Sequence, residues 1–157
     1  MAHEYGMFVG GRWVASEGGA VLEATSPSSG QVIGTVPEGT RADARRAIDA
    51  ARAAWPGWAA RSAFDRAAAM RRVAEAVAAA REGLADTLTL DQGKPRAAEA
   101  RDEVEELIAY FELAAADATR VEGLLPPSVD PRKRVLLQRV PRGVVAVISP
   151  WNWPYTM

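Results

Sequence analysis

The residues best suited to do chemistry lie near the end of the chain, where an asparagine stands between two prolines and two tryptophans. The segment reads Ile148-Ser149-Pro150-Trp151-Asn152-Trp153-Pro154. The prolines stiffen the loop and the tryptophans can anchor it by packing, so the Asn152 amide can be aimed at a fixed point. Its two N–H donors suit a site that stabilises an oxyanion. An asparagine can equally satisfy the backbone of its own turn, so both roles stay open.

An apolar run directly before this loop predicts the element that positions it. Val144-Val145-Ala146-Val147-Ile148 is continuous and rich in β-branched residues, as in strands covered on both faces of a parallel sheet. Loops that follow such strands are where α/β enzymes bind ligands. The residues after Ile148 are too few for a crossover helix and a partner strand, so we expect an incomplete α/β fold. The alternative is that the run pairs with the N-terminal strands in a small closed α+β domain.

Short strands and tight turns are predicted before residue 40. Phe8-Val9 and Trp13-Val14 lie on either side of Gly10-Gly11, and glycine tolerates the positive φ angles of a two-residue hairpin. A second strand pair is predicted at 21–25 and 32–36, with the turn residues 27–30 between them.

Capping patterns predict two helices after these strands. Thr40 with Asp43 and Ser62 with Asp65 can each supply acceptors for the free N–H groups of a first helical turn. The first helix is predicted at 41–54 and should stop at Trp55-Pro56-Gly57. The second carries an apolar stripe, with Gly83 as a possible break, that consists of Val73, Val77, Ala80, Leu84 and Leu88.

A third helix and another strand follow a predicted loop at 91–95. The helix is predicted at 97–120, with an apolar stripe formed by Val104, Leu107, Ile108 and Phe111. Gly123 and Pro126-Pro127 should end it. Residues 135–140 then predict a strand, bounded by Pro131 and Pro141.

Composition excludes several kinds of chemistry. The 157 residues are 48% hydrophobic and 25% charged, and the net charge is -1, which gives no overall field to attract nucleic acid or an anionic membrane. The start lacks the features of a signal peptide and no apolar stretch is long enough for a membrane span, so we expect a cytoplasmic protein. There is no cysteine, and the single histidine, His3, lies in an expected solvated tail. We therefore expect no metal site.

Taken together, these segments resemble the NAD(P)-dependent aldehyde dehydrogenase superfamily over essentially the whole chain. The terminal segment is similar to its Pro-Trp-Asn-aromatic-Pro motif, although Trp153 stands where phenylalanine is commoner. Five further segments resemble the family's motifs and follow their order: 8–13, 26–30 with Ser26 replacing the usual asparagine, 55–58, 90–95 and 141–145. Each is weak alone, but their shared order indicates the N-terminal portion of the family fold.

The resemblance implies an oxidoreductase fragment: a partial cofactor-binding domain over 1–157, with an oligomerisation strand at 132–140 and no catalytic domain. In the family, a cysteine thiolate attacks an aldehyde, hydride passes to NAD or NADP, and a glutamate assists hydrolysis of the thioester to the acid. Asn152 matches the asparagine that stabilises the thiohemiacetal oxyanion. The positions that match the strand end and loop lining the nicotinamide side are Ile148, Ser149, Pro150 and Trp151.

Further expectations follow for the chain's partners. Since it lacks a cysteine, it should show no dehydrogenase activity alone, while the full-length enzyme would act on a small-molecule aldehyde and form a homo-oligomer. Asp91 aligns with a position that helps hold a monovalent cation in some members, although an acid in a loop at a helix end is the simpler role. Neither nucleic acid nor membrane is an expected partner.

Two other interpretations stay open. The chain could be a non-enzymatic interaction module that docks on full-length subunits through 132–140. It could also bind nucleic acid through basic residues near this strand, although lysine and arginine there more often prevent unwanted strand pairing. These residues are Arg132, Lys133, Arg134, Arg139 and Arg142.

Overall fold

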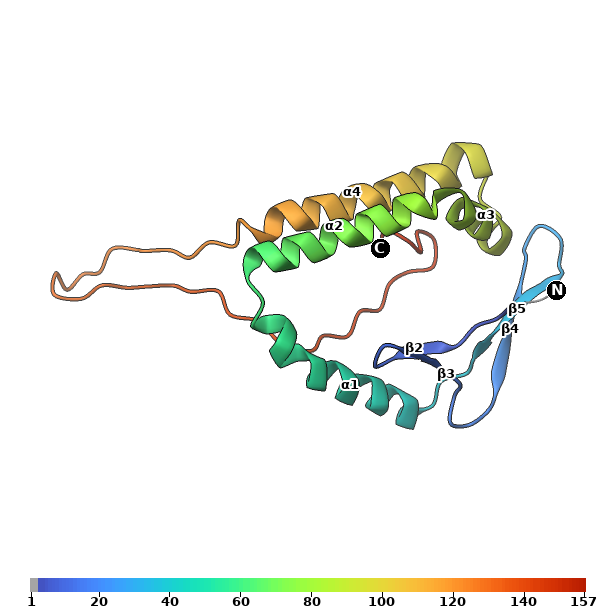
Figure 1. Cartoon of the computed structure of the whole chain (residues 1–157), viewed down its shortest axis with the longest axis horizontal. Helices are drawn as coiled ribbons and strands as arrows, with labels where there is room; N and C mark the ends of the chain where they lie inside the picture. Colours follow the sequence, from blue (N-terminus) through green and yellow to red (C-terminus); the bar gives the residue numbers. More distant parts are fainter. Residues whose placement is uncertain (1–2) are drawn as a thin grey trace.

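A computed structural model describes residues 3–157 and shows a layer of helices beside a small β region (Figure 1). Met1 and Ala2, where the start without signal-peptide features begins, lie outside the described residues. The helices are α1 (Arg41–Ala59), α2 (Ala63–Ala79), α3 (Arg81–Gln92), the π-helical turn η1 (Arg96–Ala100) and α4 (Arg101–Ala118). The strands are β1 (His3–Glu4), β2 (Met7–Val9), β3 (Arg12–Val14), β4 (Val21–Thr25) and β5 (Val32–Pro37). None of the helices between His3 and Met157 has the length and apolar character needed to cross a bilayer.

The hairpin of β2 and β3 confirms the first predicted strand pair. Val9 pairs with Arg12, and the turn glycines Gly10 and Gly11 have φ angles of 60° and 80°. A two-residue turn with positive φ at both positions matches the twist of the strands it joins. This register places Phe8 opposite Trp13, and their ring centroids lie 5.0 Å apart.

Strands β4 and β5 pair antiparallel, which confirms the second predicted pair. Strand β1 adds a parallel edge, in which His3 pairs with Gly34 and Glu4 with Thr35. The prediction of a solvated tail is therefore wrong for the backbone at His3 and Glu4, because the free edge of β5 supplies partners for its N–H and C=O groups. The side chain of His3 lies outside the described residues.

The start of α1 is as predicted, but its end is not. The Thr40 hydroxyl accepts from the Asp43 N–H at 3.2 Å, and the Asp43 carboxylate accepts from the Thr40 N–H at 2.8 Å. The helix then continues through Pro56 to Ala59, so the predicted stop at 55–57 is wrong. Proline keeps a helical φ and removes only one donor. After it, the Ala60 N–H still bonds to the Pro56 carbonyl at 3.0 Å.

Helices α2 and α3 form the predicted pair of pieces, although they separate at Ala80 and not at Gly83. The Ser62 cap is confirmed, because its hydroxyl accepts from the Asp65 N–H at 3.1 Å. At the break, the Ala80 N–H lies 3.2 Å from the Ala76 carbonyl and its own carbonyl accepts from the Leu84 N–H at 3.0 Å. The backbone groups stay bonded across the junction, so no glycine is needed there.

The core lies where α3, η1 and α4 meet, and α2 packs along α4 (Figure 1). Its buried members are Ala85, Leu88, Ala100 and Val104. Val104 confirms the predicted stripe of α4, whose other members are half-buried. The loop predicted at 91–95 is shorter in the structure, because Asp91 and Gln92 still belong to α3. Gly93 ends that helix at a φ of 74°, a left-handed conformation that glycine adopts without strain.

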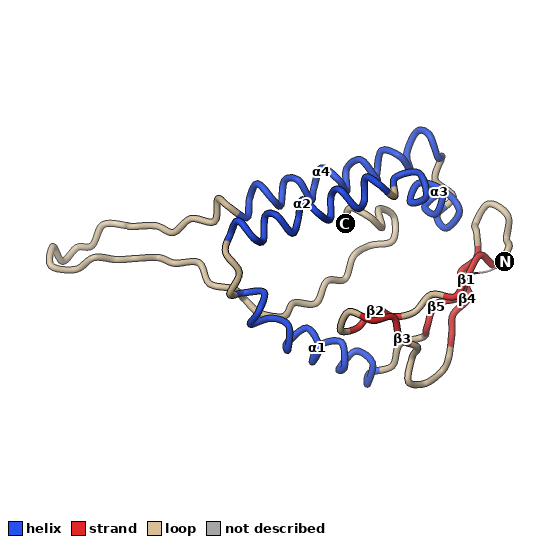
Figure 2. Tube along the Cα trace, viewed as in Figure 1, coloured by secondary structure: helices blue, strands red, loops and turns tan. Residues whose placement is uncertain are grey.

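After α4 the chain runs out as a long extended arm, returns past the end of α1, and runs between α1 and α2 to its end (Figure 2). The strand predicted at 135–140 is wrong here, since its pairing is limited to a bridge between Leu137 and Leu124. The strand predicted at 144–148 is also absent, and so is its alternative pairing with the N-terminal strands, because the sheets of residues 3–157 contain only β1 to β5. An extended segment becomes a strand only when a neighbour supplies its hydrogen bonds.

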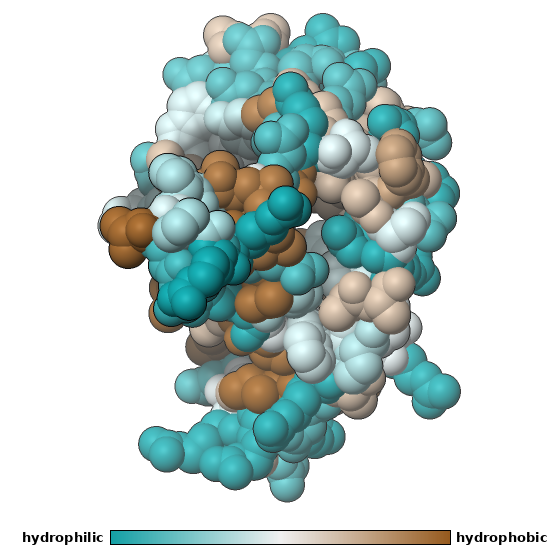
Figure 3. All heavy atoms as spheres, turned by 90° about the vertical axis from the view of Figure 1, so that its left-hand side faces the viewer, coloured by the Kyte–Doolittle hydropathy of each residue, from teal (hydrophilic) through white to brown (hydrophobic). Residues whose placement is uncertain are grey.

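Apolar side chains of this last region face outward. The exposed fraction is 81% for Val147 and 95% for Ile148. Figure 3 looks toward the tip of the arm and shows apolar patches between polar ones on that face. The chain therefore has the helices and hairpins of an α/β fold, while the apolar segments after α4 remain uncovered.

Candidate active site

The candidate residues form one exposed stretch that leads into a turn. Ile148, Ser149, Pro150, Trp151 and Asn152 are all exposed, whereas Trp153 to Thr156 are half-buried. Asn152, the only asparagine of the chain, thus lies at the boundary between an open segment and an anchored one. The five predicted site residues are consecutive, so the structure places them along one extended segment.

The turn after Asn152 is closed by backbone groups. The N–H groups of Thr156 and Met157 donate to the Trp153 carbonyl at 3.3 and 3.1 Å. The amide of Asn152 is therefore not what closes this turn, which was the simpler of its two possible roles. An exposed amide on a closed turn is available for a ligand.

A buried carboxylate holds the turn from behind. Glu103 of α4 is 0% exposed. One of its oxygens accepts from the Tyr155 backbone N–H at 2.9 Å, and the other accepts from the Lys94 ammonium at 2.6 Å. Because a buried charge is tolerated only when it is paired and hydrogen-bonded, these contacts join the end of the chain to α4 and to the turn before η1.

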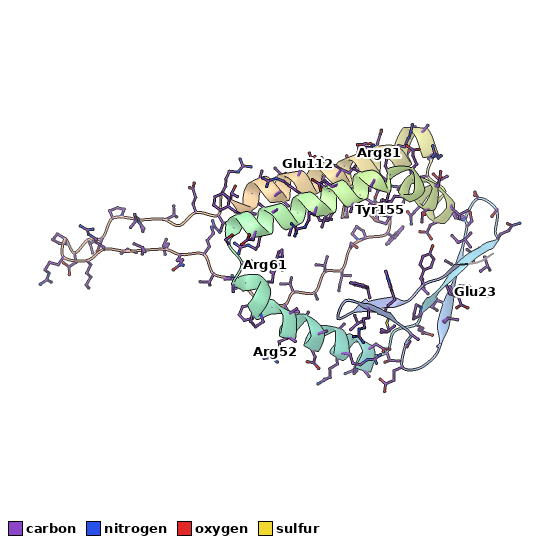
Figure 4. The ribbon with its side chains drawn as sticks, viewed as in Figure 1. Glu23, Arg52, Arg61, Arg81, Glu112 and Tyr155 are labelled. Atoms are coloured by element: carbon purple, nitrogen blue, oxygen red, sulfur yellow. The ribbon has the colours of Figure 1, made fainter. Side chains whose placement is uncertain are left out.

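The aromatic residues of the turn, Trp153 and Tyr155, also contact the helices and the turn before η1. The Lys94 ammonium lies 4.1 Å from the centroid of the Trp153 ring, a cation–π distance. The Tyr155 hydroxyl donates to the Leu84 carbonyl at 3.0 Å, and Tyr155 lies below the junction of α2 and α3 (Figure 4). Burial, followed by the nearby Glu103 and Asp91 carboxylates, raises the pKa of Tyr155. The tryptophan anchor expected from the sequence is therefore Trp153, while Trp151 is 81% exposed.

Sequence reasoning missed this cluster of Lys94, Glu103, Trp153 and Tyr155. Lys94 was seen only as part of a loop motif, and Tyr155 was not considered. One signal was available: Glu103 stands four residues before Leu107 and therefore shares the apolar stripe of α4, where an acid needs a partner. Lys94 is such a partner across η1, whereas the contact with Tyr155 depends on the path of the chain end, which local periodicity does not contain.

Asp91 and the basic residues of the arm lie on the surface. Asp91 is exposed and lies in the last turn of α3, and residues 3–157 hold no group of acids and histidines arranged for a metal ion. Arg132 and Lys133 both pair with Asp130, at 3.1 and 3.8 Å. Part of the positive charge considered for nucleic-acid binding is thus already compensated.

Known proteins are similar in sequence to this chain. The family model described as "Aldehyde dehydrogenase family" matches residues 13–157. Glutarate-semialdehyde dehydrogenase of Pseudomonas putida is 39% identical over 96% of this chain and 31% of its own length. Succinate-semialdehyde dehydrogenase [NADP(+)] of Escherichia coli is 35% identical over 95% of this chain and 31% of its own.

Solved structures agree. The crystal structure of an NADP-dependent enzyme from E. coli matches with a TM-score of 0.94 and 33% identity, over 98% of this chain and 32% of that one. A betaine aldehyde dehydrogenase of Staphylococcus aureus, in complex with NAD+, matches with a TM-score of 0.91 and 33% identity, over 98% of this chain and 31% of that one. The extended arm and the terminal turn lie within the matched region.

The chain belongs to the aldehyde dehydrogenase family, and its fold is an incomplete N-terminal part of the family fold. It spans 31% of the length of the curated relatives described above. These relatives are oxidoreductases, which confirms the family assigned from the motifs. The roles of the individual site residues belong to the proposal that follows.

Proposed function

We propose that this chain supplies the oxyanion-stabilising amide, that of Asn152, to a dehydrogenase that oxidises an aldehyde to a carboxylic acid with NAD or NADP. The single observation that carries the proposal is the exposed Asn152 on a turn whose closure does not need its amide. Its position matches the asparagine of the motif in the resemblance described above.

The chemistry explains why a held amide matters. When a nucleophile adds to an aldehyde, negative charge develops on the former carbonyl oxygen. An N–H donor that already points at this position stabilises the charge without reorganising. Since the chain has no cysteine, the thiolate and the glutamate base would come from parts of the family fold outside these residues. The 157 residues alone are therefore proposed to be inactive.

The segment before Asn152 fits one side of a nicotinamide cofactor. Ile148, Pro150 and Trp151 offer exposed apolar surface for a flat ring, and the Ser149 hydroxyl can bond to a ribose or a carboxamide. The cofactor, when bound, accepts the hydride of the aldehyde. Relatives are named for NADP(+) or solved with NAD+, so the proposal keeps both.

The exposed arm supports a proposal about partners. Leu136 is 73% exposed and Val140 is 73% exposed, within the segment 132–140 that resembles the family's oligomerisation strand. We propose that this segment pairs with another subunit in the assembled enzyme, which would be a homo-oligomer. Neither nucleic acid nor membrane is part of this proposal, and a cytoplasmic location remains an expectation.

A chimera tests the function. Residues 1–157 replace the equivalent segment of the P. putida glutarate-semialdehyde dehydrogenase, and reduction of NAD(P) is followed with glutarate semialdehyde. Asn152→Ala should lower kcat by about 10²–10³, the usual loss for one oxyanion donor. Gln31→Ala is the matched control, because it removes an exposed amide from the β4–β5 turn and should change little. An active chimera that is insensitive to Asn152→Ala would contradict the proposed role.

A second candidate function is docking without catalysis, which the uncovered arm favours. The purified chain should then co-elute with an intact homologous dehydrogenase, and Leu136→Asp should abolish the co-elution. A chain that always elutes as a separate monomer would count against docking.

A further inference from the structure

We infer that Glu103 and Lys94 are positioning residues for Asn152: the buried carboxylate and its ammonium partner fix the turn that follows Asn152 and thereby its direction. The inference rests on the proposed function, because it concerns the same amide. It assigns roles to residues that lie on α4 and in the turn before η1, far from Asn152 in the sequence.

Both partners of the salt bridge are largely shielded from solvent. Glu103 is 0% exposed, and its neighbour Val104 belongs to the core. The side chain of Lys94 is only 12% exposed. A salt bridge in such a place is stable only if the two groups remain together and their other bonding positions are filled. The pair thus has little freedom to move while α4 stays packed.

The terminal turn supplies the second hydrogen bond of the Glu103 carboxylate. The second oxygen of Glu103 accepts from the backbone N–H of Tyr155 at 2.9 Å. This bond does not depend on the side chain of residue 155. It fixes the main chain of the turn, and through it the peptide planes that lead back to Asn152.

Lys94 contacts the turn at another residue. Its ammonium bonds to Glu103 at 2.6 Å and lies 4.1 Å from the centroid of the Trp153 ring. Trp153 directly follows Asn152. The turn is therefore held at Trp153 by the cation and at Tyr155 by the carboxylate. Two attachment points, on either side of Pro154, restrict rotation of the turn as a whole.

The direct test is amide hydrogen exchange on the 157-residue chain, read at Tyr155. Glu103→Gln keeps the shape but removes the charge, and we expect exchange at Tyr155 to become about tenfold faster through local opening. The amides of Val104 and Ala115 should keep their protection, which shows that α4 remains packed. Glu105→Gln is the matched control, because it changes an exposed acid on the same helix, whose side chain is 52% exposed.

Lys94 variants keep the test decisive even if Glu103→Gln disturbs the helices. Lys94→Met should also speed exchange at Tyr155, and Lys94→Arg should restore protection because it keeps the charge. Because the two charges act as one unit, exchange at Tyr155 in the double variant Glu103→Gln/Lys94→Met should differ little from exchange in Glu103→Gln alone. Unchanged exchange at Tyr155 in Lys94→Met, or an equal rise in Glu105→Gln, would overturn the inference.

The chimera separates this inference from the proposed function. In it, Lys94→Met should lower kcat about tenfold and leave KM for the aldehyde within about twofold, the pattern of an interaction that acts in the transition state. Lys94→Arg should restore kcat. If Asn152→Ala does not change kcat while exchange at Tyr155 still depends on Lys94, the proposed function is wrong. The attachment of the turn by Glu103 and Lys94 is then still supported. If KM rises and kcat is unchanged, the positioning role fails while Asn152 keeps its own test.

Discussion

Helices α2 and α4 enclose Ala74, Val104 and Ala115, each at most 4% exposed, whereas Val129, Val147 and Ile148 are each at least 81% exposed. The first region, residues 3–118, satisfies its backbone with caps, turns and short sheets of its own. The second region, residues 119–157, is extended, and the Leu124–Leu137 bridge is its one β-pairing. The first region is thus stabilised by contacts within itself. Most of the second region has the same backbone course as in the longer relatives, but its apolar side chains are not covered by other parts of the protein.

The terminal turn is the exception within the second region. Glu103 and Lys94 attach it to the first region, directly after Asn152. This contrast indicates that the first region holds the terminal turn in position.

Core substitutions should separate the two regions most clearly. Leu88→Ala removes a side chain that is 2% exposed and should lower the free energy of unfolding by about 2–5 kcal/mol. Ile148→Ala removes a similar volume from an exposed position and should change it by less than about 0.5 kcal/mol. Urea unfolding followed by circular dichroism measures both. Equal losses would mean that the second region has a core of its own.

Removal of a helix cap should give a smaller effect of the same kind. Thr40→Ala deletes the acceptor for the Asp43 N–H and should destabilise the chain by about 1 kcal/mol. Ser128→Ala deletes a similar bond to the Asp130 N–H in the arm, where we expect a change within about 0.5 kcal/mol. If Ser128→Ala lowers the free energy of unfolding more than Thr40→Ala does, the claim that the first region carries most of the stability is wrong.

Low pH should affect the first region. The bond from the Thr40 N–H, together with those from Ser16 and Glu17, holds the pKa of Asp43 well below its usual range. A depressed pKa stabilises the fold above the unfolded value, about 4, and the contribution is lost as pH falls through the folded value. Helical circular dichroism should therefore weaken below about pH 4, and Asp43→Asn should remove part of that pH dependence.

High pH should affect the anchored turn. Burial raises the pKa of Tyr155, so its contribution is complete below the unfolded value, about 10, and is lost as pH rises through the folded value. Trp153 emission should change above about pH 10, and Tyr155→Phe should remove this change. An identical alkaline transition in the phenylalanine variant would show that another group is responsible.

The sequence predicted those parts of the fold that depend on neighbours along the chain. Gly10-Gly11, the caps at Thr40 and Ser62, and the apolar stripe of α4 are local patterns, and all were confirmed. The end of α1 was wrong because Pro56 stands close enough to the helix end to remove only one bond. The strands at 135–140 and 144–148 were wrong for this chain because β-branched composition predicts an extended backbone, whereas a strand also needs a partner.

The candidate site also contains residues that a local motif predicts and contacts that it does not. A motif identified Asn152 and the residues before it, and the structure places them on an exposed stretch that leads into the terminal turn. The contact between Glu103 and Tyr155 could not be predicted, because the two residues meet only after the chain has returned to the helices. Lys94 reaches Glu103 across η1, only nine residues along the chain, but the geometry of that turn is not contained in the apolar pattern of α4. Their roles, like that of Asn152, stay predictions until the variants are measured.

The central claim is that 144–148 lacks its cover here and gains it when the rest of the family fold is present, so that the turn and Asn152 face a complete reaction centre. Amide exchange of these residues, compared between the chain alone and the P. putida chimera, tests it most directly. We predict rapid exchange in the chain alone and protection greater by about 100-fold or more in the chimera, as expected for a central strand. Equal exchange in both proteins, or protection already present in the isolated chain, would contradict the claim.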